Sequence, residues 1–440
     1  MPTFLSLTKA ELMQDIVLAL EKESSDLCIL NGYQDYPDSI DSDIDAISDN
    51  PRRIPHILSQ QKEITLVQVL QHETKAFYYI VYRASEKRPA FIALDVSGDY
   101  RRDGRIFFSG AEFLESCQSF KFFKVPSANL EFAYYLVKKL AKEDLNQEQA
   151  QRLSDLYQLQ PQECQKQLQR LFPETEVKAI AQAAQNRNWQ EIYSQIGRLR
   201  QVMLNKAGKR QPLKVLSYWF GDVVRRCQRF LQPTGLMVVF LGADGSGKST
   251  VIDRVEQDLS PMFRQTQYIH LRPRLGMKVS QENTPVVDPH CQAARGWLVS
   301  VMKLFYFLFD YGIGYLWQIR PLLVRSTFVL FDRYYHDLLV DPKRYRFGAN
   351  MWLAKLFGLL IPKPDLWILL DAPAEVLQAR KQEVTFAETA RQRQAYLEIC
   401  KELSNSVVID TYKDLDEVVT DVNKVILKVM ENRTKQRLKL

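Results

Sequence analysis

The chain has 440 residues, enough for two or three domains that each bury a core of their own. Hydrophobic residues make up 46% and charged residues 25%, a composition that excludes a disordered or fibrous protein. The six cysteines are scattered without CxxC or Cys/His spacing, which argues against a zinc site or a disulfide framework and fits reduced thiols in the cytosol.

The net charge of +7 is unevenly distributed along the chain. Residues 1–150 carry 17 Lys and Arg against 23 Asp and Glu, so the remainder is strongly basic. A basic half suits anionic ligands such as nucleotides, although a solvated basic face gives the same count. No recognised nucleic-acid-binding motif accompanies the charge, so nucleic acid is the weaker candidate.

Neither export nor membrane insertion is expected from the hydropathy pattern. The N-terminal residues include acids and a lysine where a signal peptide requires an apolar run. The most apolar stretch, 297–330, is interrupted by Lys303, Asp310, Arg320 and Arg325, so no uncharged run of about 18 residues survives. We therefore expect a cytoplasmic protein without a transmembrane segment, and we favour a buried core helix over a membrane-surface helix for this stretch.

Residues 1–140 mix helix and strand patterns. Apolar residues at helical spacing predict a helix over 10–22. Strand-like runs follow at 27–30, 65–70, 77–82 and 91–96.

Three aspartates in this first region form a pattern that suits metal binding. Asp43 and Asp45 stand at i and i+2 after a glycine turn at Gly32, and Asp95 ends a later strand-like run. Alternation along a strand places Asp43 and Asp45 on one face, where two magnesium ions could bridge them to a triphosphate. An acidic loop that holds these aspartates by chance is the alternative.

This arrangement resembles the nucleotidyltransferase fold over about residues 25–100. It departs from that pattern because a tyrosine follows Gly32 in place of the usual serine or glycine. The resemblance implies an α+β domain over 1–140 with Asp43, Asp45 and Asp95 as metal ligands. Whether this domain is active stays open.

The segment over 141–232 is expected to be wholly helical. The predicted helices are 147–159, 162–171, 176–185 and 189–203, with breaks at 186–188 and 207–212. The segment either covers the first domain or joins it to the next.

From Gly235 onward strands and helices alternate, which predicts a parallel α/β domain over 233–440. The expected strands are 236–241, 267–270, 328–331, 366–370 and 406–409.

A phosphate-binding loop follows the first of these strands. Residues 242–249 match the pattern GxxxxGK[ST], between an apolar strand and an expected helix over 251–259. Glycines let backbone N–H groups close around a phosphate, Lys248 reaches the β- and γ-phosphate oxygens, and Ser249 offers a hydroxyl to Mg²⁺. The pattern thus predicts ATP and Mg²⁺ as cofactors. The predicted binding residues are Gly242, Asp244, Gly245, Ser246, Gly247, Lys248, Ser249 and Thr250.

Four motifs in order resemble the thymidylate kinase family over about residues 235–430. The loop has an Asp-Gly pair before its lysine, and an Asp-Arg-Tyr motif follows the strand that ends at Asp332. The stretches 364–380 and 406–419 are similar to that family's fourth strand with its helix and to its last strand with its helix. The resemblance implies a P-loop kinase fold, a parallel sheet with flanking helices.

The resemblance also implies roles for residues outside the loop. Asp332 would hold the magnesium shell or orient the attacking oxygen, and Arg333 would clamp the acceptor phosphate. Arg272, just after the second strand, is a candidate for the same anionic group. Arg380 would act as a lid cation that stabilises charge on the transferring phosphoryl group. Further candidate lid cations are Lys381, Arg391 and Arg393.

The acceptor is only partly specified. Arginines and no carboxylate follow the second strand, which favours a monophosphate acceptor over a hydroxyl, although His270 could serve a hydroxyl. The family's base-reading Asp-Arg or Asn-Arg pair is replaced by Asp310-Tyr311, and its glycine-rich segment is replaced by 274–290. Thymidylate itself is therefore not assured. Aromatic residues nearby form either a wall for the acceptor or ordinary core: Tyr306, Phe309, Tyr311 and Tyr315.

Three functional hypotheses follow. The first is an ATP- and Mg²⁺-dependent kinase that acts on a phosphorylated small molecule. The second is a nucleotide-binding regulatory or scaffold protein without turnover. The third adds nucleotidyl transfer by the N-terminal domain to the first. A homodimer is left open.

Overall fold

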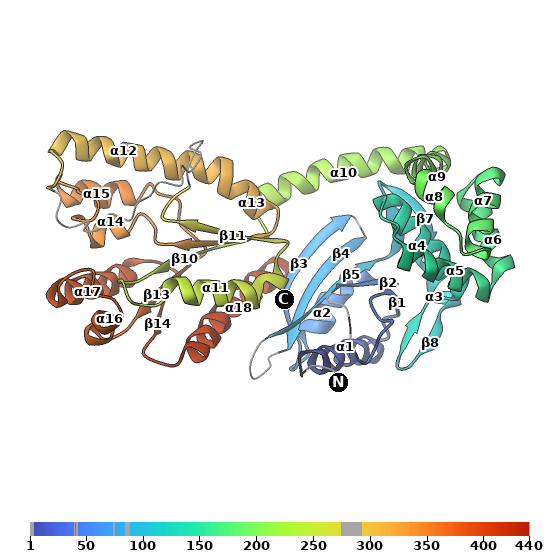
Figure 1. Cartoon of the computed structure of the whole chain (residues 1–440), viewed down its shortest axis with the longest axis horizontal. Coiled ribbons are helices and arrows are strands. Elements are labelled where there is room, and N and C mark those ends of the chain that lie inside the picture. The colour runs from blue at the N-terminus through green and yellow to red at the C-terminus, as the bar shows by residue number, and fades with distance from the viewer. Residues whose placement is uncertain are drawn as a thin grey trace. The chain divides into compact units, whose positions relative to one another are not determined.

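The computed structural model describes residues 4–38, 40, 43–73, 75–83, 89–273 and 293–439 (Figure 1). The predicted replacement segment 274–290 lies outside them. The chain divides into two compact units: unit 1 holds Met1–Arg226 with Thr434–Leu440, and unit 2 holds Cys227–Arg433. The domain boundaries at 140 and 232 stay predictions.

Unit 1 is built on a mixed seven-stranded sheet in the order β3-β4-β5-β2-β1-β9-β8 (Figure 1). The four strand-like runs expected in this region are all strands, and β2 contains Asp43 and Asp45. The strands are β1 Leu27–Asn31, β2 Asp43–Ser48, β3 Thr65–Glu73, β4 Ala76–Arg83, β5 Ala90–Ser97, β8 Gln118–Phe120 and β9 Phe123–Val125. A separate hairpin consists of β6 Asp99–Arg102 and β7 Arg105–Ser109.

Two cores hold unit 1 together. One packs α1 and α2 against β1–β5. The other packs the helices α4–α9 together with buried residues of β1, β2 and β7, so the expected helical segment shares a core with the strands. The helices are α1 Phe4–Lys22, η1 Pro51–Arg53, α2 Ile54–Ser59, α3 Gly110–Ser116, α4 Ala128–Lys142, α5 Gln147–Leu159, α6 Pro161–Leu171, α7 Glu174–Gln185, α8 Gln190–Ser194 and α9 Ile196–Arg210.

Two helix predictions in this segment were wrong in detail. The single helix expected over 189–203 is two helices, because Gln195 between α8 and α9 leaves the helical region with φ −111° and ψ 9°. The break expected over 207–212 is confined to Gln211, and α10 Pro212–Leu231 begins directly after it. Proline suits the first turn of a helix because its missing N–H would be unsatisfied there anyway.

Unit 2 has a five-stranded sheet in the order β11-β12-β10-β13-β14, and every neighbouring pair is parallel. All five strands match those expected from the sequence. They are β10 Leu236–Leu241, β11 Gln265–His270, β12 Thr327–Asp332, β13 Leu366–Asp371 and β14 Ser406–Asp410. Every residue of β10 and β12 is buried, as continuous apolar strands covered on both faces should be.

Helices cover the sheet of unit 2 (Figure 1). Buried side chains of α12, α13, α15 and α17 share a core with β10, β12 and β13, and α11 packs on β10 and β12. The helices are α11 Lys248–Leu259, η2 Ser260–Met262, α12 Trp297–Gly314, η3 Tyr315–Ile319, α13 Arg320–Val324, α14 Asp337–Val340, α15 Met351–Gly358, α16 Ala374–Arg380, α17 Phe386–Glu402 and α18 Leu415–Leu438.

The apolar stretch 297–330 is not the buried core helix that we expected. It forms α12, the π-helical turn η3 and α13 before β12 begins. Leu304 and Tyr311 are buried, but Leu298 and Met302 on the opposite face are 66% and 64% exposed. Hydropathy records how apolar a helix is and not which of its faces the fold covers.

Within the described residues this same stretch, Trp297–Val324, is the one helix long and apolar enough to cross a membrane. Only 33% of its most apolar window is buried inside the protein. Core helices of soluble proteins pass the same test of length and composition.

Candidate functional site

The glycine loop joins β10 to α11 at the carboxyl end of the parallel sheet. Gly245 and Gly247 have φ angles of +85° and +82°, which residues with a side chain rarely adopt. A Cβ at Gly245 would also lie 2.5 Å from the carbonyl oxygen of Leu377. The loop geometry therefore requires glycine, and it leads into the N-terminus of α11, where free backbone N–H groups can bind an anion.

Lys248 is the first residue of α11 and is buried. Its Nζ donates hydrogen bonds to the carbonyl oxygens of Gly242 (2.8 Å) and Ala243 (3.0 Å). Burial, together with the nearby Arg333 guanidinium, lowers the pKa of Lys248 to about 8. The ammonium is thus held over the loop, where a P-loop lysine meets nucleotide phosphates.

Asp332 ends β12, directly opposite Phe240 on β10. Its Oδ2 accepts a hydrogen bond from Tyr268 Oη at 3.0 Å and lies 3.8 Å from His270 Nδ1. Burial alone would raise the pKa of Asp332, but His270 and the charge of Lys248 together lower it. Its Oδ1 is buried and has no hydrogen-bond partner within the described part of the chain.

A charge cluster ties the glycine loop to the exit of β12. The Arg333 guanidinium pairs with Asp244 of the loop and with Asp337, whose Oδ2 lies 3.1 Å from Nη1. Arg344 Nη1 lies 2.7 Å from the other oxygen of Asp244. Arg333 has a φ of +70°, and its N–H donates to Phe240 O at 3.0 Å. The β12 exit and the loop are therefore fixed against each other.

The same cluster controls the ionisation of its members. Burial would raise the pKa of Asp244, but the charges of Arg333 and Arg344 hold it well below its usual range. The carboxylates of Asp337 and Asp244 raise the pKa of Arg333 despite its burial. Asp337 is fully buried, which raises its pKa, and its Oδ1 accepts a hydrogen bond from Tyr396 Oη at 2.8 Å. The cluster holds its charges in place before any ligand arrives.

The structure brings some predicted site residues together and leaves others apart. Lys248, Asp244, Asp332 and Arg333 converge around the loop, as described above. Arg380 instead donates to the carbonyl oxygen of Thr411 at 3.0 Å. Its predicted role as a lid cation stays a prediction.

Arg272 is also engaged away from the loop. Its Nη1 lies 3.0 Å from Asp310 Oδ2, and its guanidinium stacks over the Tyr306 ring at 4.8 Å from the centroid. In the loop itself Ser246 is buried, whereas Ser249 and Thr250 are exposed on the first turn of α11. The nucleotide- and metal-binding roles assigned to these residues stay predictions.

The other candidate lid cations each pair with a carboxylate. Lys381 Nζ lies 2.7 Å from Glu383, and Nε and Nη2 of Arg393 donate to the two carboxylate oxygens of Asp371, each at 2.8 Å. Arg391 Nη2 lies 2.6 Å from Glu388. They form local ion pairs here.

The aromatic residues of α12 divide between core and surface. Tyr311 is buried: its Oη donates to the carbonyl oxygen of Leu271, and its ring centroid lies 4.7 Å from that of Tyr334. Tyr306 and Phe309 are 44% and 56% exposed. At the position where related enzymes are expected to carry a base-reading arginine, this chain therefore has a core tyrosine.

Sequence reasoning missed Arg344, Asp337 and Tyr268. Asp337 stands four residues after Arg333, and this i,i+4 spacing could have suggested the pair. Tyr268 lies two residues before His270 on the same strand, so alternation places both on one face. Arg344 carries no local signal, because it lies 100 residues from Asp244 along the chain.

A pocket of about 770 Å³ opens beside Asp332. Tyr268 and His270, the two neighbours of the Asp332 carboxylate, are both part of its wall. Basic and apolar side chains share the lining. The described lining residues are Gln267, Tyr268, Ile269, His270, Arg272, Pro273, Trp317, Gln318, Pro321, Leu322 and Arg325.

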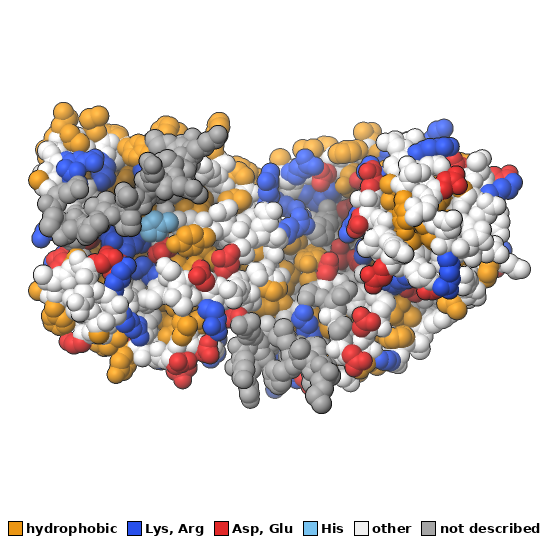
Figure 2. All heavy atoms as spheres, viewed as in Figure 1, with side chains coloured by type: hydrophobic (Ala, Val, Ile, Leu, Met, Phe, Trp, Pro, Cys, Tyr) orange, Lys and Arg blue, Asp and Glu red, His pale blue; other side chains and the backbone are white. Residues whose placement is uncertain are grey.

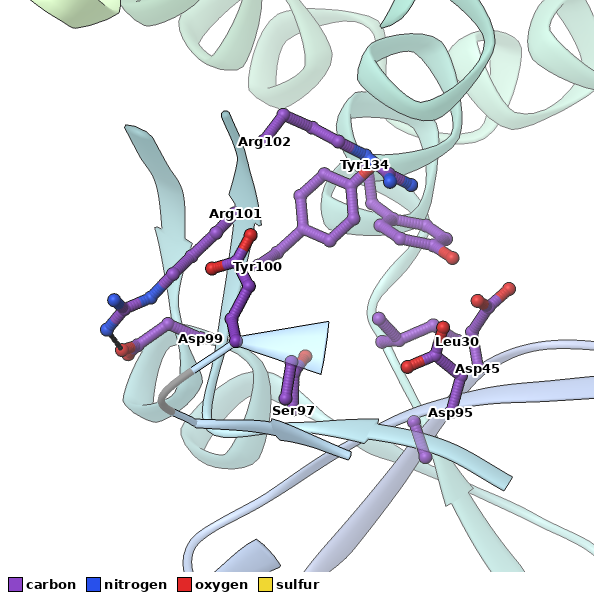
Figure 3. A pocket seen from close by; sticks show the side chains of 12 residues that line it. Leu30, Asp45, Asp95, Ser97, Asp99, Tyr100, Arg101, Arg102 and Tyr134 are labelled. Atoms are coloured by element: carbon purple, nitrogen blue, oxygen red, sulfur yellow. Dashed lines mark hydrogen bonds and ion pairs between the residues drawn. The ribbon is translucent and has the colours of Figure 1, made fainter. Parts of the chain in front are cut away.

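Unit 1 has a pocket of its own, of about 300 Å³, at the carboxylates singled out from the sequence (Figure 3). The parallel strands β2 and β5 place Asp45 opposite Asp95, and both side chains line the pocket. Tyr100 and Tyr134 face them, and Arg102 lies above with its Nε donating to Tyr100 Oη at 3.1 Å (Figure 3). The pocket thus joins acidic, aromatic and basic groups.

Charge in this pocket is incompletely balanced. Asp45 pairs with the ammonium of Lys138. Burial, with the neighbouring charges of Asp45 and Asp43, raises the pKa of Asp95 to about 7. Asp43 is exposed and does not line the pocket. Within the described ranges no three His, Cys, Asp or Glu side chains are grouped as a metal site, so the three-aspartate ligand set stays a prediction.

Comparison with known proteins gives a partial match. No protein-family model matches the chain. It is 26% identical to the probable thymidylate kinase 1 of Saccharolobus solfataricus over 200 residues, which cover 44% of this chain and 97% of that protein. It is 26% identical to the thymidylate kinase of Xanthomonas oryzae pv. oryzae over 216 residues, 46% of this chain and 88% of that protein.

Solved structures of the same kind align more loosely. Thymidylate kinase from Candida albicans aligns with 21% identity and a TM-score of 0.33, over 44% of this chain and 92% of that one. The enzyme from Ehrlichia chaffeensis aligns with 20% identity and the same TM-score, over 44% of this chain and all of that one. At these scores the superpositions themselves carry no weight.

The parallel sheet with a lysine-bearing glycine loop defines unit 2 as a P-loop NTPase fold. The relatives match a stretch of about the length of this unit and less than half of the chain. The protein thus carries a thymidylate kinase-like domain, and its likeness to these relatives supports phosphoryl transfer of the nucleoside monophosphate kinase type.

Proposed function

We propose that unit 2 transfers the γ-phosphoryl group of ATP to the phosphate of a small-molecule monophosphate in a Mg²⁺-dependent reaction. One observation carries the proposal. The fold places the buried ammonium of Lys248 and the buried carboxylate of Asp332 together at the carboxyl ends of β10 and β12, beside a loop whose backbone requires glycine at 245 and 247. This is the combination of groups that holds a triphosphate and its metal in P-loop enzymes.

The residues at this site fit Mg²⁺. The Asp332 carboxylate has a buried Oδ1 without a hydrogen-bond partner in the described chain, and its lowered pKa keeps it ionised at neutral pH. Mg²⁺ prefers such oxygen ligands. Asp332, directly or through water, and the Ser249 hydroxyl would hold the ion. Bound there, it would neutralise charge on the phosphates.

The pocket beside Asp332 is the proposed acceptor site. Its volume of about 770 Å³ falls in the range of small-molecule sites. Arg325 would supply positive charge for a phosphate, His270 offers ring nitrogens for hydrogen bonding, and Trp317 supplies an apolar surface for the rest of the acceptor. No carboxylate is among the described lining residues, so a phosphate acceptor, which needs no general base, suits the pocket better than a hydroxyl.

The remaining predicted residues take supporting roles in this proposal. The backbone from Gly242 to Thr250 would cradle the donor phosphates. Arg333 and Arg344 hold Asp244 and so fix the loop. Arg380 and Arg272 would reach anionic groups only by leaving Thr411 and Asp310. We place the reaction in the cytoplasm, and a homodimer remains a prediction that sedimentation of the pure protein tests.

The direct test is ATP consumption by the pure chain with Mg²⁺ and a panel of nucleoside monophosphates, sugar phosphates and lipid phosphates. We expect one class to stimulate ATP use, and Lys248→Ala to abolish the stimulation. Lys424→Ala, at an exposed position on α18, is the matched control and should behave as wild type. Turnover that survives Lys248→Ala contradicts the mechanism. ATP binding without stimulation by any acceptor supports the regulatory or scaffold alternative instead.

A second candidate function belongs to unit 1. We propose that the Asp45–Asp95 pocket binds a metal–nucleotide complex, as the nucleotidyltransferase-like pattern implies. The meeting of two carboxylates across parallel strands, with the pKa of Asp95 raised to about 7, supports this proposal, because a divalent cation would relieve the repulsion. Arg101 and Arg102 in the same pocket would meet phosphate oxygens.

This proposal is tested in the full chain, with Lys248→Ala present to weaken the loop site. We expect Mn²⁺-dependent binding of nucleoside triphosphate that disappears when Asp45→Asn and Asp95→Asn are added. Asp35→Asn, at an exposed position of the same unit, is the control. Metal-dependent binding that the two added substitutions leave unchanged would rule out the pocket.

A further inference from the structure

An apolar surface on unit 2 lies outside both candidate sites. On α12 the side chains of Leu298, Met302, Phe305 and Phe309 are 66%, 64%, 59% and 56% exposed. Their spacing of four, three and four residues makes them one stripe along the helix. On α15 Trp352 and Leu356 are 61% and 49% exposed. We call these six residues the α12–α15 face.

The two helices form one continuous surface. Phe305 of α12 meets Phe357 of α15 edge to face, with ring centroids 5.0 Å apart. Figure 2 shows hydrophobic side chains gathered along the edge of unit 2 that α12 occupies. Soluble monomers rarely expose apolar patches of this kind, which mark interaction surfaces.

The charged residues on the two segments that carry this face are mostly basic, although Glu398 and Glu402 of α17 line a pocket together with Lys355 and Lys363. The segments 293–325 and 351–363 contain six basic residues and one acidic residue. That acid, Asp310, is buried and paired with Arg272. Among the bases, Lys355 and Lys363 are exposed on α15 and just beyond it. The face is therefore apolar with a mostly basic border.

Exposed tryptophans also lie on α12 and α15. Two of the six tryptophans of the chain belong to these helices: Trp297, next to Leu298, and Trp352 of the face itself are 54% and 61% exposed. A half-apolar ring with one N–H donor is suited to the boundary between lipid headgroups and acyl chains. An exposed tryptophan is otherwise rare, because burial of its large ring is strongly favourable.

We propose that the α12–α15 face docks unit 2 on an anionic lipid bilayer as a peripheral contact. Apolar side chains would enter the interface while Lys355 and Lys363 meet negative headgroups. The helix would lie in the interface and not span the bilayer, because Leu304 and Tyr311 on its other side are part of the core around the sheet. This proposal does not depend on the phosphoryl-transfer reaction.

A second copy of the chain is the competing occupant, and charge argues against it. In a two-fold dimer the same patch meets itself, so the basic borders of both copies would lie close together. A bilayer that contains anionic lipid supplies the opposite charge instead. The observations therefore favour lipid over self-association.

The test is co-flotation of the full chain with vesicles of phosphatidylcholine alone or mixed with phosphatidylglycerol. We expect binding to the mixed vesicles, weakening with salt, and a blue shift of tryptophan emission. Leu298→Ser/Met302→Ser should weaken binding about tenfold or more, since it removes apolar area at the interface. Lys355→Glu/Lys363→Glu should weaken it by a similar factor on the mixed vesicles only.

Matched controls use exposed residues elsewhere in unit 2. Phe386 and Tyr412 are 48% and 67% exposed, and Phe386→Ser/Tyr412→Ser should bind as wild type. Circular dichroism and ATP binding report that each variant is folded. Failure of the wild type to float with mixed vesicles overturns the proposal. So does flotation that the face variants leave intact, or a wild-type dimer that Leu298→Ser/Met302→Ser dissociates while no vesicle binding is seen.

Discussion

Buried carboxylates stand at both candidate sites, but their neighbours differ. In unit 2 Asp244 lies between Arg333 and Arg344, and Asp332 lies near Lys248 and His270. The pKa values of both carboxyls are lowered although burial opposes this. In unit 1 Asp95 faces Asp45, and its pKa is raised to about 7. The loop site is charge-balanced without a ligand, whereas carboxylates outnumber the arginines that line the unit 1 pocket.

This difference bears on what each site is suited to do. A balanced cluster is rigid and keeps its donors aimed before a nucleotide arrives, which lowers the reorganisation that phosphoryl transfer requires. An acidic pocket with excess negative charge is stabilised most by a cation that binds to it. We therefore expect the unit 1 pocket to be suited to cation binding more than to holding preoriented catalytic groups. Changing one carboxylate at a time in each unit tests this comparison.

The largest effect is expected from Asp332→Asn. The amide can still accept the hydrogen bond of Tyr268, but it no longer carries the charge that complements the metal and Lys248. We expect kcat to fall roughly a thousandfold. Steady-state kinetics with the best acceptor measures this, and Asp253→Asn, at an exposed position of α11, is the control. Full activity of Asp332→Asn would mean that Asp332 is a structural residue.

The next largest effect is expected from Asp244→Asn. This change leaves Arg333 and Arg344 facing each other without their shared carboxylate. Breaking a buried ion pair by removing one partner costs about 3 kcal/mol of unfolding free energy. Denaturant unfolding measures the loss. Arg344→Ala added to Asp244→Asn should restore part of the stability, and additive losses in this double-mutant cycle would show that the two residues are uncoupled.

The two sites also differ in how much of each could be predicted from the sequence. The loop, the five parallel strands and the position of Asp332 follow from local patterns: a glycine spacing, continuous apolar runs and a strand end. Lys248 needs no distant partner to be recognised. Alternation along one strand is also local, but the pairing of β2 with β5 that sets Asp45 opposite Asp95 is not, and only the resemblance to the nucleotidyltransferase fold pointed to it.

The partners that balance the loop site were not accessible in this way. Arg344 meets Asp244 only because the chain after α14 returns to the loop, and no local pattern encodes that return. Arg380 was expected to act as a lid cation, but it lies against Thr411, a residue from the far edge of the sheet. The apolar stretch 297–330 was expected to be buried, since hydropathy does not say which face of a helix stays uncovered.

A smaller effect is expected in unit 1 from Asp95→Asn, which should raise the stability of the fold where Asp244→Asn lowers it. The folded-state pKa of Asp95, about 7, lies above the ordinary aspartate value of 3.8, so the folded state binds more protons between these values. The stability linked to this proton is present below about pH 4 and is lost as pH rises through 7. The other charges that act on Asp95 are those of Asp45, Asp43, Arg102 and Lys138, and they stay in place in the variant.

Asp95→Asn should therefore stabilise unit 1 at pH 8 by on the order of 2 kcal/mol, and by less at pH 5. Thermal unfolding at the two pH values, in the absence of metal, measures the difference in stability between Asp95→Asn and the wild type. Asp35→Asn is the control. A stability difference that does not change with pH would show that burial and Asp45 do not raise the pKa of Asp95. The carboxylates of the two sites would then not differ in the way described above.

The smallest effect is expected from Tyr268→Phe, which removes one hydrogen bond from the Asp332 carboxylate and leaves the ring in place. Lys248 and His270 still balance the charge, so the loss should be near that of one hydrogen bond, about 1 kcal/mol or roughly fivefold in kcat. Because the hydroxyl contacts Asp332 and not the loop, KM for ATP should stay unchanged. Tyr412→Phe, on an exposed ring, is the control. A fall as large as that of Asp332→Asn would mean that the tyrosine, and not the distributed set of cations, keeps this carboxylate ionised.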